Sequence, residues 1–400
     1  MIARVWPGAL SGSIPAIASK SSAHRLMMLS ALADEPTLVS PEAHSDDIDA
    51  TLGCLSALGA DYQILPGGVC IRPGRSRPGG EADCFESGST LRFLIPLAAA
   101  LGAATCFKGR GRLPDRPLGA LTDALKAHGC AFDGEKLPFT ISGRLTGGEF
   151  RLPGDVSSQF ITGLLMALPL VGGGRIVLTT PLESAGYVRM TLTAMARFGV
   201  SVRENAEGWT VPGGRYHSPG RAEIEGDWSN AAFFLAAGAS VTGLDPASAQ
   251  PDRAAGEMLR SFSRPNRALD VRETPDLLPI LAAVAATTPG VTHFTGAARL
   301  RIKESDRLRS MAEGIRAIGG LAREFPDGLV VSCDRALPGG IVDAAGDHRV
   351  AMAFAIAGTR CLGPVTIRGA EAANKSYPAF FEDFQRLGGK ADVIQLRDDR

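Results

Sequence analysis

Six segments of the chain begin with small polar or charged residues and continue as helices that are apolar on nearly every side. They are Ser21–Ala33, Ser89–Gly102, Ser157–Val171, Ser229–Val241, Asp276–Ala286 and Asp347–Cys361. A helix on the surface of a globular protein shows an apolar stripe about 100° wide rather than a fully apolar circumference. These six helices are therefore predicted to lie inside the protein, covered by other elements.

A second, amphipathic helix and short strands follow each interior helix. The second helices are predicted at Asp46–Leu58, Pro117–His128, Tyr187–Phe198, Asp252–Phe262, Asp306–Ile318 and Tyr377–Leu387. Runs typical of strands occur at 37–39, 62–65, 175–179, 328–332 and 365–367, bounded by Gly and Pro. The interior helices start at 21, 89, 157, 229, 276 and 347. The pattern is a mixed α/β repeat of about 70 residues, with one shortened copy between 229 and 276.

The chain is long enough for two hydrophobic cores. Its 400 residues exceed the ~250–300 residues at which a single core stops growing. Six copies of the repeat fit two domains of three copies each, and the Gly- and Pro-rich stretch Pro212–Gly226 is the expected boundary. The first strand, before Lys20, could belong to either domain.

Composition and negative motif searches exclude several classes of partner and cofactor. The 42 basic and 42 acidic side chains give zero formal net charge, so neither nucleic acid nor an anionic membrane is expected as a partner. Seven cysteines without a C-x-x-C pair argue against a disulfide framework or a structural zinc site, and indicate a reducing compartment. With no signal peptide and no apolar run of ~18–20 residues, a cytoplasmic enzyme is expected. Phosphate-binding-loop, zinc-protease, nucleophile-elbow and dinucleotide-binding motifs are absent from the sequence.

Cations stand beside the polar starts of these helices. Ser, Thr and Asp are the ordinary N-caps of any helix, so the polar starts alone do not indicate a function. The cations are Lys20, Arg25, Arg92, Arg116, Lys303, Arg307, Arg349 and Lys375. The copy that begins at Ser229 is the exception. A cation opposes the positive end of a helix dipole, so it is tolerated best there when an anionic ligand supplies the compensating charge. The pattern indicates a ligand rich in phosphate or carboxylate groups.

Seven short motifs occur in a fixed order. They are ASKSSAHR at 18–25, SGSTLR at 87–92, DRP at 115–117, DVSSQF at 155–160, RIKESDRL at 301–308, DHRVAM at 347–352 and KSYP at 375–378. Together they resemble the EPSP synthase family of enolpyruvyl transferases, and the resemblance extends from about Gly8 to Gly389. Each motif alone would be weak, whereas seven in order are specific.

The resemblance implies an α/β fold of two domains, each with three βαβαββ-type units around buried parallel helices. It implies one domain from 19–224 and a discontinuous one from 1–18 plus 225–400, with the active site in the interdomain cleft. The implied reaction transfers the enolpyruvyl group of phosphoenolpyruvate to the 5-hydroxyl of shikimate 3-phosphate and releases phosphate. These two small molecules are the expected partners, without cofactor or metal. We expect a monomer and, by the same resemblance, a target of glyphosate.

The resemblance also implies roles for individual residues. Phosphoenolpyruvate would contact Lys20, Gly88, Arg116, Gln159, Arg307, Arg349 and Lys375. Shikimate 3-phosphate would contact Lys20, Ser21, Arg25, Ser157, Ser158, Gln159, Ser184, Tyr187, Asp276 and Lys303. Asp276 would be the base for the 5-hydroxyl, Glu304 would protonate the methylene carbon, and Lys20 could share proton transfer to the leaving phosphate. At Gly88 the helix backbone would approach phosphoenolpyruvate too closely for a Cβ atom.

Alternatives remain open at this stage. Asp276 could be a helix N-cap, and Glu304 an ion-pair partner of Arg307. A sister reaction transfers enolpyruvate to a UDP-sugar, but its family carries Asn where Ser21 follows Lys20, and a cysteine in the loop that corresponds to 109–115. A non-catalytic anion-binding module would have lost a carboxylate or a cation of the expected site, and none is missing.

Two positions depart from the family pattern. Many members carry Asn where Glu86 stands, and the best-known members carry a neutral side chain where Arg299 stands. We expect these changes to alter inhibitor contacts rather than the class of reaction.

Overall fold

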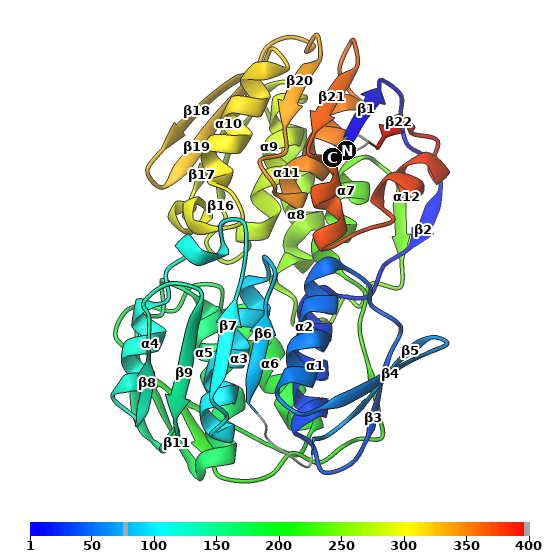
Figure 1. Cartoon of the computed structure of the whole chain (residues 1–400). Helices are drawn as coiled ribbons and strands as arrows, with labels where there is room; N and C mark the ends of the chain where they lie inside the picture. Colours follow the sequence, from blue (N-terminus) through cyan, green and yellow to red (C-terminus); the bar gives the residue numbers. More distant parts are fainter. Residues whose placement is uncertain (75–78, 396–400) are drawn as a thin grey trace. The chain divides into compact units, whose positions relative to one another are not determined.

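The computed structural model describes residues 1–74 and 79–395, and the chain forms two compact units (Figure 1). The N-terminal unit is Ala18–Glu225. The C-terminal unit combines Met1–Ile17 with Gly226–Arg400, so the N-terminal unit is inserted into it.

The N-terminal unit contains three four-stranded sheets with the orders β14-β3-β5-β4, β6-β7-β9-β8 and β10-β11-β13-β12. Its strands are β3 (Thr37–Ser40), β4 (Asp61–Leu65), β5 (Gly68–Arg72), β6 (Gly80–Asp83), β7 (Thr105–Lys108), β8 (Cys130–Phe132), β9 (Phe139–Gly143), β10 (Gly148–Leu152), β11 (Gly173–Leu178), β12 (Arg203–Asn205), β13 (Gly208–Pro212) and β14 (Arg221–Glu223). In each sheet the first two strands of the order are parallel and the later pairs are antiparallel.

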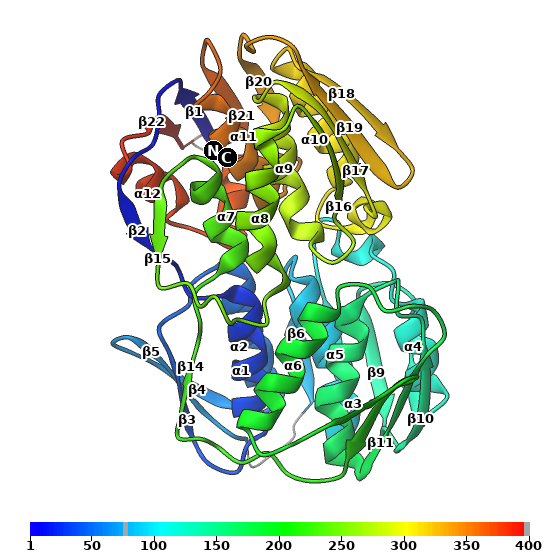
Figure 2. The same ribbon diagram turned by 180° about the vertical axis from the view of Figure 1, so that it is seen from behind.

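The helices of the N-terminal unit are α1 (Lys20–Leu32), α2 (Asp46–Ala57), α3 (Gly88–Leu101), α4 (Gly119–Lys126), α5 (Ser158–Ala167) and α6 (Ala185–Arg197), with short 3-10 turns η1 (Leu113–Asp115) and η2 (Leu168–Val171). The helices α1, α3 and α5 are largely buried, whereas α2, α4 and α6 each have an exposed face. Figure 2 shows α1, α3, α5 and α6 near the middle of the unit. Nearly every residue of α3 and α5 is buried, because their side chains are apolar on all sides.

The C-terminal unit repeats this plan. Its strands are β1 (Ile2–Trp6), β2 (Ser13–Pro15), β15 (Ser240–Thr242), β16 (Asn266–Asp270), β17 (Gly290–Thr295), β18 (Leu321–Phe325), β19 (Gly328–Cys333), β20 (Gly340–Asp343), β21 (Val365–Arg368) and β22 (Lys390–Ile394). They form sheets of the orders β16-β17-β19-β18, β20-β21-β1-β22 and β15-β2. Its helices are α7 (Trp228–Ala236), α8 (Ala255–Arg260), α9 (Leu278–Ala286), α10 (Arg307–Ala317), α11 (His348–Gly358) and α12 (Phe380–Arg386). The 3-10 turns are η3 (Pro251–Ala254), η4 (Ser261–Ser263), η5 (Pro275–Leu277), η6 (Ala298–Ile302) and η7 (Ala370–Lys375).

The shortened copy of the repeat is the one with the small sheet. There β15 pairs with β2 in parallel, and in the part of the chain that the structure describes this sheet has no antiparallel strands like those of the other sheets. The interior helix predicted to end at Val241 ends at Ala236 instead. Gly238 adopts a left-handed conformation with φ +90°, which ends the helix, and residues 240–242 form β15.

The six interior helices are confirmed as α1, α3, α5, α7, α9 and α11, all largely buried. The helices α3, α5, α9 and α11 each connect the two strands of a parallel pair. The helices α1 and α7 differ: the strand before α1, β2, pairs with the strand after α7, β15, and the strand before α7, β14, pairs with the strand after α1, β3. The prediction of a two-domain α/β fold with three copies of the repeat in each domain is therefore confirmed.

Candidate functional site

In the N-terminal unit, polar groups gather at the starts of the helices. Lys20, the first residue of α1, donates from Nζ to Asp47 Oδ2 in the first turn of α2, at 2.6 Å. One turn further on, His24 Nδ1 and Thr51 Oγ1 lie 2.8 Å apart, and Thr51 Oγ1 lies 2.7 Å from Thr90 Oγ1 of α3. These buried contacts fix the starts of α1, α2 and α3 relative to one another.

Arg25 joins α1 to α6. Its guanidinium is buried and donates to Thr191 Oγ1 at 2.8 Å, to the Tyr187 carbonyl at 2.9 Å and to the Ser21 carbonyl at 2.6 Å. Burial lowers the pKa of Arg25 to about 10. Three expected shikimate 3-phosphate residues, Ser21, Arg25 and Tyr187, are thus brought together.

Gln159 links the starts of α3 and α5. Its amide nitrogen donates to Ser89 Oγ and its oxygen accepts from Arg92 Nη1, both at 2.9 Å. Ser157 caps α5 by accepting from the Gln159 backbone at 3.3 Å, and Ser158 begins the helix. The expected substrate residues Ser157, Ser158 and Gln159 therefore lie together at the start of α5.

Ser184 precedes α6 in a left-handed conformation with φ +57°, and its side chain is buried. A residue with a Cβ atom is disfavoured in this region, and such residues cluster at functional sites. The conformation supports the role that the resemblance assigns to Ser184.

Gly88 packs beneath two guanidinium groups. A Cβ atom built on Gly88 would lie 2.6 Å from Arg116 Nη1 and 2.8 Å from Arg92 Nη1. The absence of a side chain therefore allows these arginines to lie against the start of α3, which is a different reason for glycine from the close approach of a ligand.

We expect Gly88→Ala to raise the KM for phosphoenolpyruvate, because the methyl group would displace Arg116 or Arg92. Loss of a hydrogen bond from a displaced guanidinium to an anion, about 1.5–3 kcal/mol, corresponds to roughly ten- to hundredfold weaker binding. The matched control is Gly53→Ala in α2, where an added Cβ meets no atom within 4 Å. Steady-state kinetics in which both variants kept the parental KM would show that Gly88 does not support the site.

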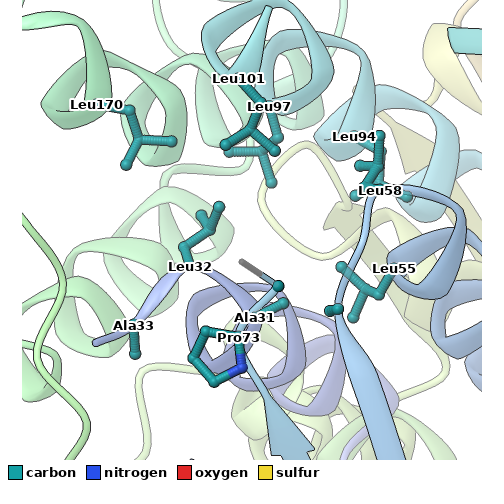
Figure 3. A pocket seen from close by; sticks show the side chains of 12 residues that line it. Ala31, Leu32, Ala33, Leu55, Leu58, Pro73, Leu94, Leu97, Leu101 and Leu170 are labelled. Carbon is teal, nitrogen blue, oxygen red and sulfur yellow. The ribbon is translucent and has the colours of Figure 1, made fainter. Parts of the chain in front are cut away.

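The opposite ends of these helices are apolar. A pocket there is lined by Leu32 of α1, Leu55 and Leu58 of α2, and Leu97 and Leu101 of α3, among others (Figure 3). The side chains that line it are apolar and offer no partner to a phosphate or carboxylate. The helix starts, rather than this pocket, are the candidate site for anions.

In the C-terminal unit, Asp276 lies among three cations. Its Oδ1 accepts from Arg307 Nη1 at 2.7 Å and lies 3.8 Å from Lys303 Nζ, and its Oδ2 accepts from Arg349 Nη2 at 3.0 Å. Asp276 lies within η5, and the N-cap residues of η5 and α9 are Thr274 and Leu277. Asp276 is therefore not an N-cap.

Arg307 is the centre of this cluster. It is almost fully buried and donates to Asp276, to Glu304 Oε2 at 2.7 Å, and from Nε to Asp347 Oδ2 at 2.8 Å. Although burial disfavours the charge, Asp347, Glu304 and Asp276 raise the pKa of Arg307 above its ordinary value. Glu304 is thus an ion-pair partner of Arg307.

The same cations act on Asp276. Burial alone would raise its pKa, but the charges of Arg349, Lys303 and Arg307 hold the pKa of Asp276 well below its ordinary value. In this arrangement Asp276 is a weak base. Its basicity would increase if anions competed for the arginines.

Lys375 reaches the start of α11 from η7. Its Nζ donates to the Gly346 carbonyl at 2.6 Å, immediately before the cap residue Asp347. Lys375 and Arg349 are therefore brought to the start of the same helix.

Sequence reasoning assigned no role in the site to Asp47, Ser229 and Asp347, which contact Lys20, Arg349 and Arg307 respectively, or to Asp252, which contacts Ser229. Each lies in the first turn of a predicted helix or immediately before it, which is the signal that could have indicated them. The Ser229 copy, which has no cation beside it in the sequence, receives Arg349 from another copy, with Nη2 3.3 Å from Ser229 Oγ.

Asp252 is buried, and burial together with the charge of Asp276 raises its pKa to about 6. A carboxyl group whose pKa is higher in the folded than in the unfolded chain destabilises the fold progressively as the pH rises from about 4 to above 6. Asp252→Asn removes the ionisable group, so its free energy of unfolding should not fall for this reason as the pH rises. Relative to the parent, its free energy of unfolding should therefore increase by about 1–3 kcal/mol between pH 4.5 and pH 8. Urea unfolding at both pH values checks this, and a constant difference would contradict it.

The two positions that depart from the family pattern lie just before α3 and within η6. The carboxylate of Glu86 lies against Gly111, and Arg299 Nη2 donates to the Arg272 carbonyl at 2.9 Å. Within residues 1–74 and 79–395, no helix is long and apolar enough to cross a membrane. The same residues contain no group of three or more His, Cys, Asp or Glu side chains that could hold a metal ion.

Comparisons with known proteins cover nearly the whole chain. The family model of EPSP synthase (3-phosphoshikimate 1-carboxyvinyltransferase) matches residues 6–264 and 247–384. The 3-phosphoshikimate 1-carboxyvinyltransferase of Clostridium kluyveri is 39% identical, with 96% of this chain and 97% of the relative covered. That of Clostridium novyi is 36% identical, with 97% and 98% covered. The EPSP synthase structure from Acinetobacter baumannii matches with a TM-score of 0.81 at 25% identity, with 98% of this chain and 100% of that chain covered.

Proposed function

The chain belongs to the EPSP synthase family, and we propose that it transfers the enolpyruvyl group of phosphoenolpyruvate to the 5-hydroxyl of shikimate 3-phosphate. The observation that carries the proposal is the carboxylate–arginine cluster around Asp276, Arg307 and Glu304, in a chain that matches the family over nearly its whole length. The product is EPSP, and the released group is phosphate.

The proposed site takes groups from both units. Each substrate carries one phosphate and one carboxylate, and bidentate arginines are well suited to both groups. For phosphoenolpyruvate we propose Lys20, Gly88, Arg116, Gln159, Arg307, Arg349 and Lys375. For shikimate 3-phosphate we propose Lys20, Ser21, Arg25, Ser157, Ser158, Gln159, Ser184, Tyr187, Asp276 and Lys303.

The reaction needs a base and an acid. Asp276 takes the proton of the 5-hydroxyl, and the oxygen of this hydroxyl attacks C2 of phosphoenolpyruvate. Glu304 gives a proton to the C3 methylene in the same step. Phosphate then leaves the tetrahedral intermediate as a proton returns from C3, and Lys20 assists this departure. Arg349, Lys303 and Arg307 hold the pKa of Asp276 low. Substrate anions would compete with Asp276 for these cations and so restore its basicity.

The test is phosphate release from phosphoenolpyruvate with shikimate 3-phosphate as acceptor, and with UDP-N-acetylglucosamine as the competing acceptor. Release that requires shikimate 3-phosphate supports the proposal. Release with the UDP-sugar alone would support the sister reaction instead. No release with either acceptor, although both substrates bind, would identify a non-catalytic anion-binding module.

A further inference from the structure

A serine hydroxyl joins Arg349 to a second buried carboxylate. Ser229 Oγ donates a hydrogen bond to Asp252 Oδ2 and accepts one from Arg349 Nη2 at 3.3 Å. The same Nη2 donates to Asp276 Oδ2 at 3.0 Å. The guanidinium of Arg349 thus lies between Asp276, which is proposed as the base, and the hydroxyl of Ser229, which is bonded to Asp252.

The side chain of Gln250 holds the segment that carries Asp252 against the start of α7. Gln250 donates from its amide nitrogen to the Gly226 carbonyl at 2.8 Å and accepts from the Trp228 backbone at 3.0 Å. It therefore ties the segment before η3 to the first turn of α7. Because Ser229 is the next residue of that turn, the segment brings Asp252 and Ser229 together.

A buried carboxylate is unfavourable unless other groups compensate its charge. Asp252 and Ser229 are both largely buried, and the positive charge of Arg349 favours the ionised form of Asp252. The negative charges of Asp276 and Asp227 disfavour the ionised form of Asp252 and raise its pKa. The charge of Arg349 and the hydroxyl of Ser229 both favour the ionised form of Asp252, and Ser229 links the two charged groups.

We infer that Ser229 and Asp252 are positioning residues that hold the guanidinium of Arg349 in place for its anion. The inference rests on the proposed function in one respect, that Arg349 contacts phosphoenolpyruvate. When an anion competes with Asp276 for Arg349, the hydroxyl of Ser229 is retained as a fixed partner. The guanidinium then need not reorient, and Asp276 is released to act as a base.

Kinetics of three variants test the inference. Ser229→Ala should raise the KM for phosphoenolpyruvate about tenfold or more, as expected for loss of a hydrogen bond to a charged group. Asp252→Asn removes the charge but keeps an acceptor for Ser229, so it should raise this KM less. Both should change the KM for shikimate 3-phosphate much less. Ser229→Thr keeps the hydroxyl and should restore a KM close to that of the parent. The matched control is Thr292→Val, because Thr292 is also a buried hydroxyl that accepts from an arginine, Arg267 Nη1, at 3.0 Å.

A direct measurement separates this inference from the proposed function. In the ligand-free protein, the Nε–Hε NMR signal of Arg349, assigned by its loss in Arg349→Lys, should shift in Ser229→Ala and stay in place in Thr292→Val. If the parent released no phosphate with shikimate 3-phosphate, the proposed function would fail, and the NMR comparison would still decide whether Ser229 holds Arg349. An unmoved signal in Ser229→Ala, or a KM that Ser229→Ala changes no more than Thr292→Val does, would overturn the inference.

Discussion

Glu304→Gln is expected to lower kcat by ~10²–10⁴, the range for loss of a general acid, while the affinity for phosphoenolpyruvate changes little. Glutamine keeps the shape and can still accept from Arg307 Nη2, which Glu304 does at 2.7 Å. It cannot give a proton to the methylene carbon. Pre-steady-state measurement of the chemical step, together with equilibrium binding, separates the two effects.

The matched control is Glu313→Gln in α10. Glu313 also accepts from an arginine, Arg309 Nε at 2.9 Å, but on an exposed face. Such a pair contributes little, so the control should keep the parental kcat and affinity. If Glu304→Gln kept the parental kcat and lost only affinity, Glu304 would balance the charge of Arg307 without donating a proton.

Asp276→Asn is expected to change two quantities in opposite directions. The value of kcat should fall by ~10²–10⁴, because asparagine cannot take the proton of the 5-hydroxyl. Binding of phosphoenolpyruvate should stay equal or become tighter, because Arg307 and Arg349 no longer face a carboxylate that competes with the ligand. Turnover and calorimetric titration measure the two quantities separately.

Asp61→Asn is the control for this charge removal, since Asp61 pairs with Arg72 at 3.4 Å on an exposed surface. It should leave both quantities unchanged. An Asp276→Asn enzyme that lost phosphoenolpyruvate affinity as strongly as turnover would show that Asp276 orients the arginines for the ligand, rather than competing with it.

The fold was predictable because burial leaves a direct mark on local sequence. A helix that is apolar on all sides must be interior, so α3, α5, α9 and α11 could be recognised without any knowledge of their neighbours. The error at α7 is also local. Residues 240–241 are apolar or small and continue the pattern of the helix, but the left-handed Gly238 ends it before β15.

The class of ligand was also suggested by local sequence, because cations beside helix starts indicate anions. The individual assignments rested on resemblance to a family, and those for Lys20, Arg307 and Asp276 stay predictions until they are tested. The packing of Gly88 against Arg116 was not predictable, because the two residues lie on different elements and belong to two separate sequence motifs.

By itself, the sequence determined the repeat, the interior helices and the presence of cations at their starts, because each of these depends on residues within one or two turns. Only the tertiary structure decided which charges meet. Asp276 pairs with Arg307 at a separation of 31 residues and with Arg349 at 73, and Arg349 reaches Ser229 at 120. Periodicity specifies which face of a helix is buried, but it contains no information on which copy of the repeat lies beside which. That arrangement holds the pKa of Asp276 low, raises that of Asp252, and places both carboxylates on the same arginine network.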